Sequence, residues 1–260
     1  MKSRVAGHFG EWIQGRFGPS GSVVLVTVPC PELYVEVERI SDGQLAVQQY
    51  ADLLEPKRAR MLLTHVGGLA GKYRLTGNIS PGVGAGASTA ALIALARAAE
   101  GDETLLAHAC IQCEGASDPL MFDAPDRVLW ASREGRVLSD LPKLPSAEIV
   151  GGSWGSPLAT DAHDNAFPDV LDLATRLQDT VSLAELAEIS TESAARCQHL
   201  RGPDGDPTLD LIQEFDALGC LRAHTGSARG FIFRPGEAPK DADVILRTAG
   251  YSGVMKFQTE

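Results

Sequence analysis

Runs of apolar residues alternate with polar breaks along the chain and predict a mixture of strands and helices. Ser22–Val28 is a continuous β-branched run, which is typical of a buried strand. Leu33–Glu38 alternates apolar and acidic residues, as in a half-exposed strand. Pro29 and Pro31 stand between these runs, so we expect them to separate two strands. Further strands are predicted at residues 44–50, 71–79, 128–130, 148–150, 230–233 and 253–257.

Helical patterns lie between the early strands and again in the second half of the chain. Ser182 and Glu185 form the S-x-x-E pattern of a capping box, which predicts a helix that runs to about His199. The remaining helices are expected near residues 51–66, 88–100, 103–114, 208–218 and 241–248. This order, with strands early and helix–strand units late, predicts an α+β fold.

Composition is that of an ordinary globular protein. The 260 residues are 44% hydrophobic and 22% charged, which suffices for one large domain or two smaller ones with a core. The net charge of −11 argues against a general nucleic-acid binder, because such proteins displace counterions with a basic surface. The Pro-rich stretch Leu141–Pro145 predicts a boundary between two lobes, residues 1–145 and 146–260.

Neither a membrane span nor a secretory leader is expected. No stretch approaches the ~20 apolar residues that a span needs, and the first 20 residues contain no apolar core. Five scattered cysteines suit a reducing compartment, so we expect a cytoplasmic protein. Cys110 and Cys113 form a lone C-x-x-C, which lacks a second pair for zinc. We expect both to be buried as small hydrophobic side chains rather than to form a redox or metal site.

The segment Pro81–Ala91, P-G-V-G-A-G-A-S-T-A-A, carries the clearest functional signal. Its glycines allow the backbone to approach a ligand closely, because no Cβ stands in the way. The residues behind it are strong helix formers, so free N–H groups and the positive end of the helix dipole face an anion. We expect this loop to bind phosphate through Pro81, Gly82, Val83, Gly84, Ala85, Gly86, Ala87, Ser88 and Thr89.

Two common phosphate-binding motifs do not fit this loop. A P-loop reads G-x-x-x-x-G-K-[ST], and no lysine stands in residues 78–91. The dinucleotide fingerprint G-x-G-x-x-G fits poorly, because the glycines here run G-x-G-x-G. The acidic residues about 20 positions on, Asp102 and Glu103, also lie between two predicted helices rather than after a strand. Taken alone, the loop is either a phosphate site or a tight turn that packs small residues against a helix.

Four segments together resemble the GHMP kinases, the family of galactose, homoserine, mevalonate and phosphomevalonate kinases. Residues 81–91 are similar to the family's ATP loop, P-x-G-x-G-L-[GA]-S-S, and Ala223–Gly230 is similar to its A-H-S-G-T-x-x-G motif. Gly10–Gly15 with Leu25–Pro31, and Cys113–Asp123, resemble the branch that contains the L-threonine kinases of cobalamin biosynthesis and propanediol utilisation. The segments occur in the family's order along most of the chain.

The resemblance implies a two-lobed α+β fold, with a left-handed βαβ crossover in the N-terminal lobe and a ferredoxin-like C-terminal lobe. It implies phosphoryl transfer from ATP, with Mg²⁺, to a small-molecule alcohol, most specifically L-threonine to give O-phospho-L-threonine. The acceptor alternatives are homoserine or a sugar. A relative that binds nucleotide or metabolite without transfer is a third alternative, because the glycines of the loop stand one position out of phase with the family.

The resemblance and the side-chain chemistry assign roles to five residues outside the glycines. Ser88 is expected to bind a phosphate oxygen or Mg²⁺, or alternatively to cap the following helix. Glu114 is the expected carboxylate ligand of Mg²⁺. Asp118 stands where related kinases carry the aspartate that accepts the hydroxyl proton, although it could instead hold the substrate or cap a turn. Glu11 and Gln14 are expected to contact the acceptor, Glu11 through an ammonium group.

The segment from the second half of the chain is expected to close over the site from the other lobe. Its expected substrate contacts are His224, Thr225, Gly226 and Ser227. Of these, His224 is expected to be packed and hydrogen-bonded rather than catalytic. Arg229 is expected either to meet phosphate or to be solvent-exposed. His8 is a candidate for the acceptor pocket, and Asp123 is a weaker acidic candidate.

Overall fold

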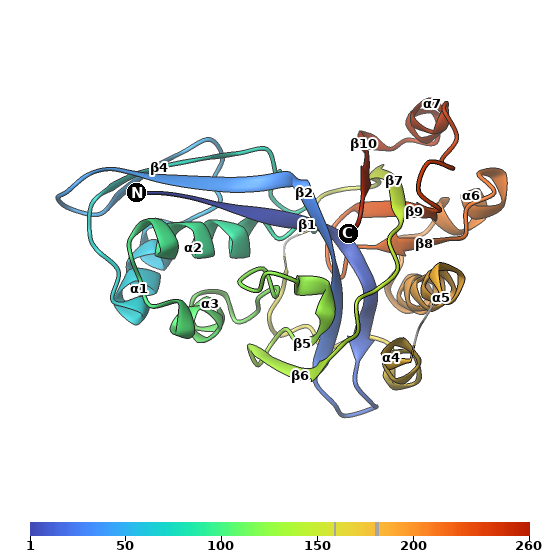
Figure 1. The fold of residues 1–260 in the computed structure, drawn as a ribbon, viewed down its shortest axis with the longest axis horizontal. Helices are drawn as coiled ribbons and strands as arrows, with labels where there is room; N and C mark the ends of the chain where they lie inside the picture. The colour runs from blue at the N-terminus through green and yellow to red at the C-terminus, as the bar shows by residue number, and fades with distance from the viewer. Residues whose placement is uncertain (159, 180–181) are drawn as a thin grey trace.

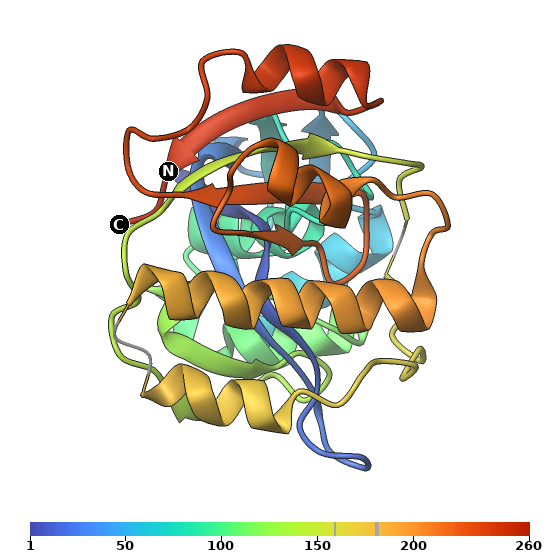
Figure 2. The same cartoon turned by 90° about the vertical axis from the view of Figure 1, so that its right-hand side faces the viewer.

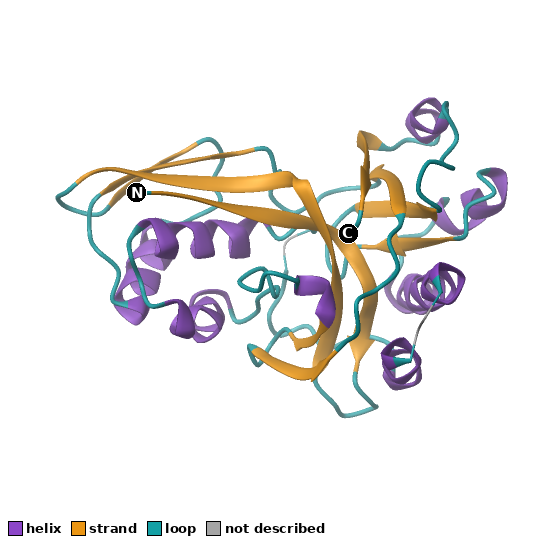
Figure 3. Ribbon diagram, in the orientation of Figure 1, coloured by secondary structure: helices purple, strands orange, loops and turns teal. Residues whose placement is uncertain are grey.

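The computed structural model describes residues 1–158, 160–179 and 182–260, and its strands form one continuous curled sheet (Figures 1 and 3). The strands are β1 Lys2–Arg16, β2 Val23–Ser41, β3 Ala46–Gln49, β4 Lys72–Gly77, β5 Val128–Ala131, β6 Arg136–Asp140, β7 Glu148–Ser153, β8 Gly219–Arg222, β9 Ala228–Phe233 and β10 Ser252–Gln258. Their order is β10-β7-β9-β8-β1-β2-β4-β3, with β5 and β6 added beside β2.

Helices cover the two halves of this sheet separately. They are α1 Pro56–Val66, α2 Ala87–Ala98, α3 Leu106–Glu114, α4 Leu171–Gln178, α5 Leu183–Arg201, α6 Thr208–Glu214 and α7 Ala242–Thr248, with 3-10 turns at Glu103–Leu105 and Pro125–Arg127. Figure 1 shows α1–α3 beside the half that holds β3 and β4, and α4–α7 beside the half that holds β7–β10. Figure 2 shows α5 lying across the second half, where it packs on β1 and β8.

The long hairpin of β1 and β2 joins the two halves. Its antiparallel register runs from Lys2 opposite Glu38 to Arg16 opposite Val23. At one end β2 pairs with β4, which pairs in parallel with β3 in a β3–α1–β4 unit. Near its middle β1 pairs with β8, which leads into the antiparallel strands β9, β7 and β10. The hairpin therefore holds the two sets of helices on one scaffold.

Two hydrophobic cores flank the hairpin. In the first, the almost wholly apolar α2, with Leu92 and Leu95 fully buried, packs on side chains such as Val35. In the second, Trp12 from β1 packs with Leu186 from α5 and with residues of β7 and β9. The predicted boundary at Leu141–Pro145 falls in the connection between β6 and β7. The first core contains only residues before that boundary, whereas the second draws on residues from both sides of it, including β1 and β2.

Most predicted elements are present with shifted ends, but the two prolines do not separate two strands. Strand β2 runs without interruption from Val23 to Ser41. Pro31 lies in a bulge, since Cys30 faces Gly7 and the next paired residue, Tyr34, faces Ala6. Within the described residues, the edge of β2 away from β1 is unpaired at these prolines, so the sheet loses no hydrogen bond there.

Other differences follow from tertiary packing. Strands β1, β6 and β8 and helix α4 are not predicted by the hydrophobic pattern, and the helix expected at 208–218 ends at Glu214 because the chain turns into β8. The helix expected from residue 51 begins at Pro56, which is favoured in the first turn. The capping box of Ser182 and Glu185 is present as predicted.

All five cysteines are buried, as expected for the C-x-x-C pair. Cys110 and Cys113 are free and buried, as are Cys30, Cys197 and Cys220. None of the described helices is long and apolar enough to cross a membrane.

Candidate functional site

The glycine-rich loop leads directly into the N-terminus of α2. Gly82, Gly84 and Gly86 have φ values of +76°, +78° and +71°, which lie in the left-handed region that residues with a side chain rarely adopt. Gly86 is the N-cap residue of α2. The backbone conformation of this turn therefore requires glycine at these three positions of the sequence pattern. Ser88 is the second residue of the helix rather than its cap, which removes its alternative role.

The same glycines let other segments approach the loop closely. A Cβ on Gly84 would lie 2.2 Å from the carbonyl oxygen of Thr225, and a Cβ on Gly86 would lie 2.6 Å from Cδ2 of His8. Either contact is far shorter than van der Waals distance, so a larger residue would push these segments apart. The loop thus holds β1 and the segment after β8 in fixed positions around it.

The loop forms one wall of a cavity of about 320 Å³, a volume in the range of small-molecule sites. The expected residues that line this cavity are Pro81, Gly82, Gly84, Ala85, Gly86, Ala87, Ser88, Thr89, Glu11, Glu114, Asp118, His224, Thr225 and His8. The expected residues that lie outside its lining are Val83, Gln14, Asp123, Gly226 and Ser227. Segments from β1, α2, the end of α3 and the turn after β8 are therefore brought together.

At the glycine loop, the cavity carries a hydroxyl and a carboxylate in contact with each other. The hydroxyl of Ser88 donates a hydrogen bond to Oε1 of Glu114. Nη1 of Arg58, from α1, lies 3.0 Å from the same oxygen. Burial raises the pKa of Glu114, although Ser88 and Arg58 act against that rise. Hydroxyl and carboxylate oxygens are ligands that Mg²⁺ accepts, so this pair fits the predicted ion.

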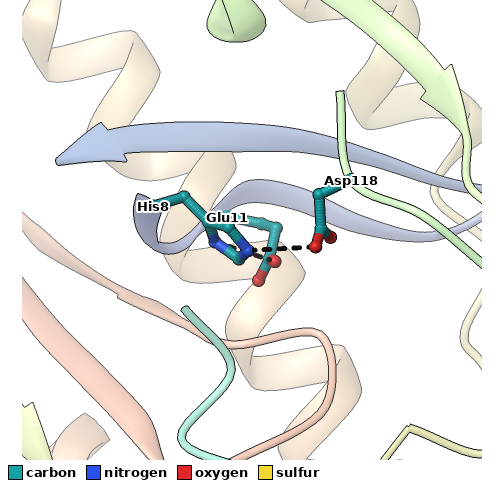
Figure 4. Close-up of side chains that lie close together, drawn as sticks. All are labelled: His8, Glu11 and Asp118. Carbon is teal, nitrogen blue, oxygen red and sulfur yellow. Dashed lines mark ion pairs between the residues drawn. The ribbon is translucent and has the colours of Figure 1, made fainter. Parts of the chain in front are cut away.

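Beside this pair, the His8 ring lies between two carboxyl groups (Figure 4). Its Nδ1 is 3.6 Å from Oε1 of Glu11, and its Nε2 is 3.6 Å from Oδ2 of Asp118. His8 and Glu11 are only 2% exposed. Gly10, with φ of +69°, lies between them in β1, and the pairing register of β1 with β2 shifts here. Each ring nitrogen faces a different carboxyl group, and one ligand atom from each of the three side chains lies within 4.8 Å of the other two.

The three groups shift one another's ionisation. Burial disfavours the charged form of His8, but Asp118 and Glu11 outweigh it and raise the pKa of His8 to about 9. Burial raises the pKa of Glu11 to about 8. Burial also opposes ionisation of Asp118, but the neighbouring His8 charge outweighs it and holds the pKa of Asp118 below its usual value. At neutral pH the cavity therefore contains an ionised Asp118 beside a charged imidazole.

Glu11 also ties β1 to the segment that follows β8. Its Oε2 accepts a hydrogen bond of 2.5 Å from the backbone N–H of His224, while Oε1 faces His8. Both oxygens are thus engaged within the protein, and binding of a substrate ammonium by Glu11 stays a prediction. Gln14 is buried, and its side-chain amide donates to the Arg222 carbonyl oxygen at 3.2 Å.

His224 is packed, as expected, but its ring nitrogens are not hydrogen-bonded. The ring stacks on Phe167 with centroids 4.1 Å apart and 6° between the planes, and the Arg201 guanidinium lies 4.0 Å from the centroid of the same Phe167 ring. Neither ring nitrogen has a partner within the described part of the chain. Burial, aided by the charges of Arg133 and Arg201, lowers the pKa of His224 to about 3, so the ring is neutral.

Two cavity arginines, Arg58 and Arg133, were missed by sequence reasoning, and Arg229 takes neither of its expected positions. Arg58 lies on an ordinary amphipathic helix and Arg133 in the β5–β6 turn, so no local pattern marks them. Arg229 is buried and forms a 2.7 Å ion pair with Asp206, outside the cavity lining. It therefore takes neither of the positions expected for it, at the glycine loop or in solvent.

Comparison with known proteins identifies the fold. No family model and no curated protein sequence matches this chain. The chain is similar to a mevalonate kinase from L. major in complex with R-mevalonate, with a TM-score of 0.64, 14% identity and coverage of 99% of this chain and 96% of that one. It is similar to a 4-(cytidine 5'-diphospho)-2C-methyl-D-erythritol kinase, with a TM-score of 0.60, 19% identity and full coverage of both chains.

A third similar structure is that of a putative homoserine kinase from Listeria monocytogenes, with a TM-score of 0.57, 14% identity and coverage of 100% of this chain and 95% of that one. At such identities the likeness establishes the fold. The chain therefore has the two-lobed α+β fold of these kinase structures, as the resemblance of its motifs predicts.

Proposed function

We propose that this chain is a small-molecule kinase that transfers a phosphoryl group from ATP to a hydroxyl group. The observation that carries the proposal is one cavity in which a glycine loop at a helix N-terminus meets two acidic centres. The first centre is Ser88 with Glu114, and the second is Asp118 with His8. Phosphoryl transfer needs a phosphate cradle, a cation that neutralises phosphate charge and alignment of the acceptor hydroxyl. In this proposal the loop is the cradle, Ser88 and Glu114 hold the cation, and Asp118 aligns the hydroxyl.

In the proposed reaction, the loop and the first turn of α2 hold the phosphates of ATP through backbone N–H groups. The acceptor oxygen attacks the γ-phosphorus while Asp118 takes the hydroxyl proton, and the bond to the β–γ bridging oxygen breaks to release ADP. His8 keeps Asp118 ionised before this step, because its charge opposes the cost of burying a carboxylate. Glu11 orients His8 from the opposite side of the ring.

Ser88 and Glu114 are the residues that would hold Mg²⁺ in this reaction. Mg²⁺, when bound, neutralises charge on the transferring phosphate. Arg58 contacts the same carboxylate, so it balances the charge of Glu114 and can contribute to phosphate binding.

For the acceptor, we propose L-threonine, with O-phospho-L-threonine as the product. This choice is supported by the resemblance of Gly10–Gly15 and Cys113–Asp123 to the L-threonine kinase branch. The similar solved structures are named for kinases of other alcohols, so homoserine remains the alternative acceptor.

Phosphorus-31 NMR of the purified protein with ATP, Mg²⁺ and one acceptor at a time tests the proposal. We expect a new phosphomonoester signal with L-threonine that coincides with added O-phospho-L-threonine. A signal only with homoserine would keep the kinase and replace its acceptor. If neither these acceptors nor mevalonate and galactose yields a phosphomonoester, the kinase proposal fails.

A further inference from the structure

The cavity contains a second group of polar side chains, distinct from the glycine loop and its metal-type ligands. Ser117 precedes Asp118 directly, and its backbone N–H donates to the carbonyl oxygen of Ser132 at 2.9 Å. This bond fixes the Asp118 turn against the end of β5, where Arg133 follows. Ser117, Ser132 and Arg133 all line the cavity. A molecule whose hydroxyl reaches Asp118 therefore lies next to this group.

Arg133 differs from the other arginines near the cavity in its lack of an ion pair. Arg58 lies 3.0 Å from Glu114, and Arg201 lies 2.6 Å from Asp164. Within the described residues, no carboxylate lies within ion-pair distance of Arg133. Its Nη2 donates to the backbone carbonyl oxygen of Asp161 at 3.0 Å. Its Nε is buried and has no partner among the described residues.

Two further polar groups of the cavity lack partners. The Ser117 hydroxyl has none within the described chain, and Ser117 is 4% exposed. Both ring nitrogens of His224 are likewise unpartnered, and this residue is 7% exposed. Buried polar groups are normally hydrogen-bonded, because leaving one unpaired costs free energy. One nitrogen of a charged guanidinium, one hydroxyl and both nitrogens of a neutral imidazole in this cavity thus lack hydrogen-bond partners within the described residues.

We propose that Arg133 binds the carboxylate of the acceptor, and hence that the acceptor is a hydroxy acid rather than a neutral sugar. This inference rests on the proposed function, since it places the acceptor in this cavity. A guanidinium presents a planar set of donors that matches the two oxygens of a carboxylate. Ser117 and neutral His224 then hydrogen-bond the remaining polar atoms of the acid, while its hydroxyl faces Asp118.

Direct binding tests this without requiring turnover. Isothermal titration calorimetry is performed with L-threonine, L-homoserine and (R)-mevalonate as acids, and with L-threoninamide and D-galactose as ligands without a carboxylate. The proteins are wild type, Arg133→Gln, Arg133→Lys and the control Arg136→Gln. Arg136 lies on the same hairpin but is exposed and paired with Glu134, so its variant removes the same charge outside the cavity.

We expect at least one of the three acids to bind the wild type, and L-threoninamide to bind more weakly than L-threonine. A hydrogen-bonded charge of this kind is worth roughly 10- to 100-fold in affinity, and Arg133→Gln should lose about that factor for the acid. The same variant should bind amide and acid alike, and Arg133→Lys should recover part of the difference. Arg136→Gln should match the wild type.

Arg133 also holds the segment around Asp161, and a merely structural role would weaken acid and amide equally. Equal losses for both ligands, binding of none of the acids, or a wild-type preference for galactose would overturn the inference. Failure of the proposed function is distinguishable from these results. Acids that bind through Arg133 but are never phosphorylated would contradict the kinase and leave the carboxylate site standing.

Discussion

Nε2 of His8 lies 3.6 Å from the carboxylate of Asp118, and both side chains line the cavity beside the glycine loop. A buried histidine that carries charge is uncommon, because burial favours the neutral ring. Here the neighbouring carboxylates reverse that preference and raise the pKa of His8 to about 9. The pair therefore consists of an ionised acid and a charged imidazole over the neutral pH range.

This pairing predicts the pH dependence of the proposed reaction. Asp118 is ionised above its lowered pKa, so kcat/KM should be flat near neutral pH and fall only as pH drops toward that pKa. In His8→Gln the cation is absent, so burial raises the pKa of Asp118. The acidic limb should then move upward by about 1–3 units.

The exposed His199, at the end of α5, provides a matched control. His199→Gln should retain the wild-type profile of kcat/KM from pH 5 to 10. An unchanged acidic limb in His8→Gln would show that the imidazole does not set the ionisation of Asp118.

A second prediction concerns Gly84 in the loop. Gly84→Ala places a Cβ 2.2 Å from the Thr225 carbonyl oxygen at a φ of +78°, so the loop must move. Gly236 has a similar φ of +83° with nothing within 4 Å of its Cβ position, and Gly236→Ala should cost only the conformational strain of about 1 kcal/mol. Urea unfolding should show a larger loss for Gly84→Ala, and only that variant should raise KM for ATP. Equal unfolding losses with an unchanged KM would contradict the packing described for the loop.

A third prediction concerns the carboxylate of Glu114, beside the glycine loop. Glu114→Gln removes the negative charge beside Ser88, so the Mg²⁺ concentration for half-maximal activity should rise and kcat should fall about 100-fold. Ser88→Ala should lower kcat by less, since it removes a neutral ligand. Glu103→Gln, which removes an exposed carboxylate paired with Arg97, should change neither quantity. Wild-type kcat and Mg²⁺ dependence in Glu114→Gln would exclude this role.

A fourth prediction concerns the stack beside the cavity. Phe167 is 5% exposed and contacts both His224 and the Arg201 guanidinium. Phe167→Ala should lower the free energy of unfolding by about 3–5 kcal/mol, because it removes a buried aromatic side chain. Phe122 is 38% exposed, so Phe122→Ala should cost clearly less in the same denaturant titration. Similar losses for the two variants would mean that the buried Phe167 ring contributes no more to stability than the exposed Phe122 ring.

The glycine loop was predictable because its requirement is local. Positive φ at Gly82, Gly84 and Gly86 leaves a mark in the sequence that no other residue type satisfies as well. Glu114 and Asp118 were predicted from one short segment, Cys113–Asp123, which resembles a motif of the kinase family. The helix after the loop was predictable from its local run of apolar residues, most of which are buried in one core.

The rest of the site depends on contacts between distant segments. Glu11 accepts a hydrogen bond from the N–H of His224, 213 residues away, and nothing around either residue records that contact. Arg58 and Arg133 reach the cavity only through the packing of α1 and the β5–β6 turn. Strand β2 likewise continues through Pro29 and Pro31, because no strand pairs with the edge of β2 away from β1 at these residues and no backbone N–H donor is required there.

The most direct test of the proposed kinase is acceptor-dependent ADP release by wild type, Asp118→Asn and Asp123→Asn. Asp123 is exposed and lies outside the cavity lining, so its variant controls for the loss of one nearby carboxylate. L-threonine should stimulate ADP release by wild type and Asp123→Asn, and Asp118→Asn should lower kcat by roughly 100- to 10,000-fold. ADP release that no acceptor stimulates, or that Asp118→Asn leaves unchanged, would contradict phosphoryl transfer at this site.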